Sequence, residues 1–159
     1  MMGYIMDLRK IVGHRKLLMP GAGVFPIQDG KVLLQRRKDN GLWGDHGGSV
    51  ELSEKVEDAV RREMQEETGL LPGKLEFLGI YSGPEMDYVY PNGDQVSIIG
   101  MYFTCTDFSG TVRLQAEEVT DLKWFPLDQL PRAEEISPMS RRPLFDAAEK
   151  YRNLQKNEG

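Results

Sequence analysis

A glycine pair, Gly47-Gly48, followed shortly by a strongly amphipathic helix, constrains the fold more than any other segment of the sequence. Ser53 is a suitable N-cap residue, so we expect the helix over residues 55–68, with Gly69 as its C-terminal stop. The apolar positions of the segment recur at helical spacing and form one stripe, namely Val56, Ala59, Val60 and Met64. Such a stripe must be buried. The sequence therefore predicts a helix that packs on a neighbouring layer of structure.

Three glutamates of the same helix, Glu63, Glu66 and Glu67, have the spacing i, i+3 and i+4 and share one face. Their carboxylates repel one another unless cations compensate them. Several oxygen ligands on a rigid surface suit Mg²⁺ or Mn²⁺. A charge run on a helix more often marks a solvated face. The preceding glycine pair favours the metal site instead, because glycine lets the backbone approach a metal or a phosphate closely.

The net charge of the chain is concentrated in this region. The whole sequence holds 20 Lys+Arg and 25 Asp+Glu, for a formal charge of −5. Segment 51–67 alone holds seven acids and three bases, so four of these five charges belong to it. The acidic balance argues against a general nucleic-acid binder. No apolar stretch reaches the length of a membrane helix. The single cysteine, Cys105, fits a reducing cytoplasm.

The remaining elements predict an α+β fold with a mixed sheet and helices packed on it. Apolar spacing and turn residues place a glycine-rich loop over 40–48 and a hairpin-type turn over 91–94. We expect helices over 4–12 and 142–155, strands over 17–27, 31–37, 75–81, 96–105 and 122–125, and a helical turn over 127–130.

The fixed positions from 48 to 70 resemble the Nudix box. They are Gly48, Glu54 and the run Arg62-Glu63-Met64-Gln65-Glu66-Glu67-Thr68-Gly69-Leu70. Segments 21–37 and 118–130 are similar to the opening hairpin and to a later segment of the same family. The resemblance to MutT-like Nudix hydrolases implies a Nudix fold, an α/β/α sandwich with a mixed β-sheet and the Nudix-box loop-helix. It also implies one domain over 1–159, with a core of about 17–131 and added terminal helices.

The resemblance further implies a set of site residues. Divalent metal, Mg²⁺ or Mn²⁺, is expected on the box, and its implied ligands are the loop carbonyl of Gly48 together with Glu54, Glu63, Glu66 and Glu67. The implied catalytic residues are Glu63, Glu66, Glu67, Arg62 and Glu118, with the general base left open between the acids. Glu54 is expected to hold the box through Arg62.

Candidate substrate contacts lie outside the box. Arg36 and Arg37 at a strand end can bind phosphate through bidentate contacts, or simply lie exposed there. Tyr81, like Tyr88 and Tyr90, can stack on a base or pack in the fold. His46 is expected on the surface or bracing the loop rather than at a ligand.

The resemblance implies metal-dependent hydrolysis of a nucleoside diphosphate linked to another moiety, by water attack on a diphosphate phosphorus. A nucleoside triphosphate and a nucleotide sugar are two versions of this small-molecule substrate. The alternative is a non-catalytic Nudix-like module that senses nucleotide or binds a partner. RNA ends are disfavoured because the chain lacks a basic track. By analogy with relatives, a homodimer is also expected.

Overall fold

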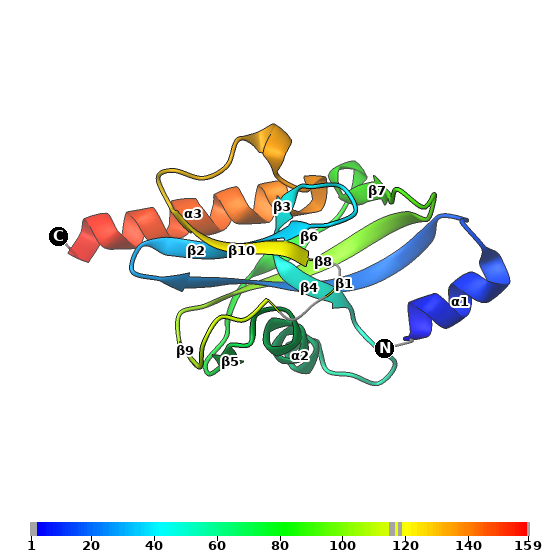
Figure 1. Ribbon diagram of the computed structural model, residues 1–159, viewed down its shortest axis with the longest axis horizontal. Coiled ribbons are helices and arrows are strands. Elements are labelled where there is room, and N and C mark those ends of the chain that lie inside the picture. The colour runs from blue at the N-terminus through cyan, green and yellow to red at the C-terminus, as the bar shows by residue number, and fades with distance from the viewer. Residues whose placement is uncertain (1–2, 115–116, 118, 159) are drawn as a thin grey trace.

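A mixed β-sheet forms the centre of the molecule in the computed structural model, which describes residues 3–114, 117 and 119–158 (Figure 1). Strands β1 and β8 pair in parallel along ten residue positions, and the other pairs are antiparallel. The main strand order is β10 (Val119–Pro126), β2 (Lys31–Arg37), β1 (Leu17–Gln28), β8 (Gln95–Cys105) and β6 (Glu76–Tyr81). The side branches are β3 (Trp43–Gly44), β4 (His46–Ser49) and β7 (Asp87–Val89), and β5 (Leu71–Pro72) pairs separately with β9 (Phe108–Ser109).

Two helices cover the two faces of this sheet. Figure 1 shows α3 (Pro138–Glu158) on one side and α2 (Val56–Thr68) on the other, while α1 (Tyr4–Val12) lies beside one end of β1. Neighbouring residues of β2 divide between the two cores, because side chains alternate along a strand. Leu33 packs in the cluster under α2 and Leu34 in the cluster under α3, and both are fully buried. The sandwich is therefore apolar on both faces of its central strands.

The closing helix contains Pro143, which cannot donate a backbone hydrogen bond. The Met139 carbonyl, four residues earlier, instead accepts a hydrogen bond of 3.2 Å from the buried Tyr102 hydroxyl. The Tyr102 ring belongs to the core under α3. The sheet thus provides a donor for the carbonyl that the proline leaves without its helical partner.

Several predicted boundaries are corrected. Helix α2 begins at Val56 with Lys55 as its N-cap and no side-chain cap bond, so Ser53 is not the cap. Ser53 has a φ of 62° within a turn that the Glu54 N–H closes onto the Glu51 carbonyl. The predicted glycine-rich loop contains the two short strands β3 and β4. Residues 127–130 form a non-helical turn, and a 3₁₀ turn follows at Ala133–Glu135.

The helix at 4–12 and the stop at Gly69 are confirmed. So is the turn at 91–94, which joins β7 to β8. In the part of the chain that the structure describes, no helix is long and apolar enough to cross a membrane.

We predict that Met64→Ala lowers the free energy of unfolding by about 2–5 kcal/mol, the usual cost of emptying a buried methionine site. Met64 is fully buried between α2 and the sheet. Gln65→Ala, one exposed position further along the same helix, should stay within about 0.5 kcal/mol of wild type. Denaturant unfolding measures both. Equal losses in the two variants would contradict the assignment of this core.

Candidate metal and substrate site

The loop before α2 is fixed by its pairing with the central strand. Strand β4 runs antiparallel to β1, with Gly47 opposite Gly23 and Gly48 opposite Ala22. A methyl group on Gly47 would overlap the Ala22 carbonyl oxygen and lie 2.8 Å from the Gly23 Cα. A methyl group on Gly48 would lie 2.6 Å from Glu63 Oε1. At Gly47 the obstacles are backbone atoms of β1, so only glycine allows this close pairing, whereas at Gly48 a methyl group would displace the Glu63 carboxylate.

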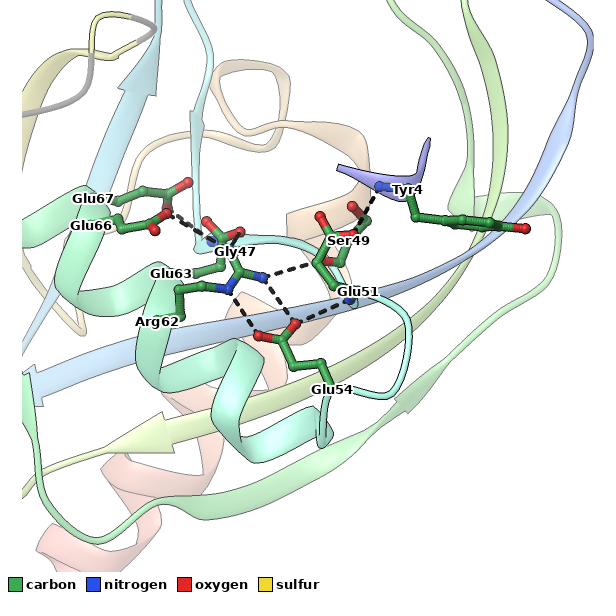
Figure 2. A network of polar contacts seen from close by, with 9 residues as sticks. All are labelled: Tyr4, Gly47, Ser49, Glu51, Glu54, Arg62, Glu63, Glu66 and Glu67. Atoms are coloured by element: carbon green, nitrogen blue, oxygen red, sulfur yellow. Dashed lines mark hydrogen bonds and ion pairs between the residues drawn. The ribbon is translucent and has the colours of Figure 1, made fainter. Parts of the chain in front are cut away.

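Arg62 connects the acids of α2 to the loop (Figure 2). Its guanidinium donates to both carboxylate oxygens of Glu54, at 2.9 and 3.1 Å, and to Glu63 at 2.8 Å. The hydrogen bonds from Arg62 hold the pKa of Glu54 below its usual range. Glu54 also accepts a hydrogen bond of 3.1 Å from the Glu51 N–H. The arginine therefore holds the loop against the helix, and a bidentate pair of this kind fixes both distance and orientation.

The three glutamates of the predicted acidic face differ in their exposure. The side chains of Glu63 and Glu67 are 14% and 16% exposed, whereas Glu66 is 56% exposed. Burial raises the pKa of Glu63 and, together with the charge of Glu63, raises that of Glu67 well above its usual value. The Gly47 N–H donates to Glu67 at 2.9 Å. Two carboxylates are therefore kept side by side, partly out of water, against the loop backbone.

A cavity of about 250 Å³ opens between these acids, the loop and α1. Among the described residues, no three His, Cys, Asp or Glu side chains converge on one point as ready metal ligands. Glu63 and Glu66 both face the Arg62 guanidinium, at 2.8 and 3.7 Å. The donor set nevertheless fits a hard cation. Burying adjacent carboxylates is costly without positive charge nearby, and carboxylate oxygens are the donors that such cations prefer.

A second, larger cleft of about 800 Å³ meets this cavity along the backbone of Gly47, Gly48 and Ser49, which line both. Arg37 and Tyr90 line the cleft. The Arg37 guanidinium pairs with Asp39 at 2.9 and 2.7 Å and lies 5.8 Å from the Tyr90 ring centre. These contacts hold a cation and an aromatic ring at the wall of the cleft.

The other predicted substrate contacts lie elsewhere. Arg36 donates to the Gly41 carbonyl at 2.9 Å and lies over the Trp43 ring. The Tyr81 hydroxyl donates to Asp146 at 2.7 Å, and its ring packs against Tyr102. Neither Arg36 nor Tyr81 lines the cavity or the cleft. Glu118 lies outside the described residues.

The sequence did not identify Asp45 and Ser140 as site residues. Both line a small pocket of about 90 Å³ behind the glycine pair, together with Arg37 and Tyr90. The Ser140 hydroxyl donates to Asp45 at 2.5 Å, and burial raises the pKa of Asp45. The only sequence signal for Asp45 is its position just before the glycine pair. Ser140, on α3, had none, because the contact depends on how the closing helix packs.

His46 braces the loop. Its side chain is fully buried, and Nε2 donates to the Leu33 carbonyl at 2.9 Å. Burial lowers the pKa of His46 to about 4, so the ring is neutral near pH 7. The alternative of a surface histidine is wrong. The loop-bracing role agrees with the sequence interpretation.

Comparison with known proteins identifies the family, since the model described as NUDIX domain matches residues 17–146. The chain belongs to the Nudix family. The match includes the whole box and extends into α3, past the predicted core end at 131. It leaves α1 outside.

Similar proteins support the same assignment. An ADP-ribose pyrophosphatase of Methanocaldococcus jannaschii is 37% identical in an alignment of length 131 that covers 79% of this chain and 72% of that protein. The crystal structure of a MutT Nudix hydrolase from Burkholderia pseudomallei is 30% identical, with a TM-score of 0.68 over 83% of this chain and 98% of that one. The Nudix domain of Shewanella oneidensis NrtR, solved with ADP ribose, is 25% identical, with a TM-score of 0.66 over 93% and 96% of the two chains.

These matches confirm the predicted Nudix fold and the prediction of a pyrophosphohydrolase enzyme. Nudix hydrolases bind nucleotide substrates and generally use divalent metals. Which residues of this chain bind the nucleotide and the metal stays a prediction.

Proposed function

We propose that this chain hydrolyses a nucleoside diphosphate linked to a second organic group, using a divalent cation, Mg²⁺ in the first instance, held by the acids of α2. The observation that supports this proposal most directly is that the acidic cavity and the larger cleft are adjacent. The acidic cavity and the larger cleft share the backbone of Gly47, Gly48 and Ser49. A diphosphate lying along this backbone would have its charge beside the acids and its organic groups in the cleft.

Each residue of the box has a task in this proposal. Glu63, Glu66 and Glu67, with the Gly48 carbonyl, would hold the cation, and Glu54 would act through Arg62, whose contacts keep Glu63 in place. A bound cation of this kind neutralises the diphosphate and lowers the pKa of the attacking water. Glu66, the most exposed of the three, would accept the proton of that water. Arg37 and Tyr90 would orient the nucleotide.

The comparisons favour a nucleotide sugar over a nucleoside triphosphate as the substrate to test first. One relative is named an ADP-ribose pyrophosphatase, and one structural neighbour is complexed with ADP ribose. The 800 Å³ cleft offers room for an organic group beside the acidic cavity. ADP-ribose hydrolysis would release AMP and ribose 5-phosphate.

The test is a panel of nucleoside triphosphates and nucleoside diphosphate sugars, including ADP-ribose, assayed with Mg²⁺ and with a chelator. We expect Mg²⁺-dependent release of a nucleoside monophosphate, and loss of that release in Glu66→Gln, which removes one charge with little change of shape. Full activity of Glu66→Gln would show that the metal site is misassigned. Nucleotide binding without turnover of any substrate would favour the non-catalytic module.

Arg62→Lys should lower kcat about 10- to 100-fold, the usual effect of removing a residue that orients metal ligands. Lysine cannot reproduce the bidentate contact with Glu54 while also reaching Glu63. Arg61→Lys is the matched control, because Arg61 instead donates to the carbonyls of Pro72 and Gly73. Steady-state kinetics measure both variants. Equal kcat values for the two would argue against the bracing role.

A further inference from the structure

Helix α1 forms a wall of the site although it lies outside the residues that match the family. Ile5 and Met6 line both the acidic cavity and the larger cleft. Ile5 also packs against the core under α3, whereas Met6 is 53% exposed. An apolar surface thus faces the point where the two spaces meet.

Contacts at both ends hold α1 in this position. At its start, the Tyr4 N–H donates to Glu51 at 2.9 Å, and Glu51 is joined through Glu54 to Arg62 of the box (Figure 2). Toward its end, the buried Arg9 guanidinium donates to the Gln95 carbonyl at 2.6 Å and pairs with Asp94 at 3.7 Å. The helix therefore bridges the box loop and the turn between β7 and β8, on either side of the cleft.

The charge of the cleft is balanced. Among the described residues that line it, three are basic and three acidic, namely Arg9, Arg37, Lys38, Asp39, Asp94 and Glu117. Arg9 and Arg37 are engaged in ion pairs with Asp94 and Asp39. Beyond these pairs the described lining charges are Lys38 and Glu117, which are opposite in sign, so the cleft offers a third phosphate no net positive charge. A desolvated anion is costly without a partner, whereas an uncharged group meets no such cost.

We propose that α1 is a specificity element, in which Ile5 and Met6 form the apolar wall that favours an uncharged organic group over a further phosphate on the nucleoside diphosphate. This inference rests on the proposed function for its location at the diphosphate site. The surface of Met6 that faces the cleft contacts the organic group, while Ile5 keeps the helix packed on the core. The preference is built by a segment that precedes the family core.

The test replaces the apolar Met6 side chain of this wall with the positively charged side chain of lysine. Met6→Lys adds positive charge inside the cleft, and Ile11→Lys adds the same charge at a residue of α1 that is 83% exposed and lines neither space. Isothermal titration measures the Kd of two probes, the α,β-methylene analogues of ADP-ribose and of ATP, in Mg²⁺ buffer. These probes resist cleavage at the linkage between their first two phosphates, so binding is read without turnover there.

We expect wild type to bind the ADP-ribose analogue more tightly than the ATP analogue. Met6→Lys should shift the ratio of the two Kd values by about tenfold toward the ATP analogue, the scale of a lost apolar contact in a binding site. Ile11→Lys should leave the ratio within twofold of wild type. A ratio unchanged in Met6→Lys, an equal shift in Ile11→Lys, or a wild-type preference for the ATP analogue would overturn the proposal.

The binding readout separates this inference from the proposed reaction. Selective binding that depends on Met6, without turnover of any substrate in the panel, would support the α1 wall and reject the hydrolase. Turnover of nucleotide sugars with a ratio insensitive to Met6→Lys would reject only the wall. Failure of wild type to bind either analogue, together with no turnover of any substrate in the panel, would overturn both.

Discussion

Glu67→Gln is expected to lower kcat by about 10²- to 10³-fold, the scale on which a single preorganised electrostatic group contributes to catalysis. Glu67 is the glutamate that is tied to the loop backbone, through the Gly47 N–H at 2.9 Å. The amide keeps an oxygen acceptor for that N–H but removes the negative charge that a cation would meet beside Glu63. The variant therefore isolates charge from shape.

The fold of Glu67→Gln should be at least as stable as wild type in the presence of a chelator. The Glu67 side chain is only 16% exposed and lies against a second carboxylate. A buried amide avoids the desolvation and repulsion that a buried carboxylate meets. Thermal unfolding with and without Mg²⁺ measures this. A ligand that binds only the folded state raises Tm, so Mg²⁺ should raise the Tm of wild type much more than that of Glu67→Gln.

Glu57→Gln is the matched control for charge. Glu57 lies on the same helix, is exposed, and lines neither the acidic cavity nor the cleft. Its kcat should stay within about twofold of wild type, as for a surface substitution remote from the site. A comparable fall in both variants would mean that the general charge of α2 matters, and not the place of Glu67 in the cavity.

The spacing of α2 predicted much of the site because a helix fixes which side chains share a face. Glu63, Glu66 and Glu67 all line the acidic cavity, and Gly69 ends the helix with a φ of 80°. The spacing did not predict that Glu66 is far more exposed than the other two. That difference arises from the loop backbone of β4, which lies over Glu63 and Glu67. Two of the four residues of β4 are glycines, which leave no side-chain alternation to read, so β4 itself was not predicted.

Long-range packing explains why the substrate contacts were harder to predict. Arg36 and Arg37 are neighbours on β2 and point to opposite faces, and local sequence does not say which face meets the cleft. In β6 a register shift between Phe77 and Gly79 interrupts the alternation before Tyr81. Tyr81 consequently packs against the core under α3, where its hydroxyl donates to Asp146. Both outcomes depend on strands that are distant in sequence.

Gly47→Ala should cost about 3 kcal/mol of stability, the upper range for forcing a methyl group into packed structure. The added carbon would overlap the Ala22 carbonyl and lie 2.8 Å from the Gly23 Cα. Both obstacles are backbone atoms of β1, which is paired with β8 on one side and β4 on the other. The backbone of β1 cannot move away without breaking its hydrogen bonds to β8, so the β4 loop must move instead. For a domain of this size we expect Tm to fall by about 6–12 °C.

The same displacement should lower kcat by about 100-fold even at a temperature where the variant is folded, since a shift of about 1 Å at a catalytic group has this effect. The Gly47 N–H would no longer meet Glu67, and the Gly48 carbonyl would move with it. Gly21→Ala is the control for stability, because the nearest obstacle there is the Ile98 Cγ2 methyl at 3.3 Å and not a backbone atom in overlap. That variant should lose about 1 kcal/mol or less. If Gly47→Ala unfolds like Gly21→Ala and keeps its kcat, the close pairing of β4 with β1 is not what positions the acids.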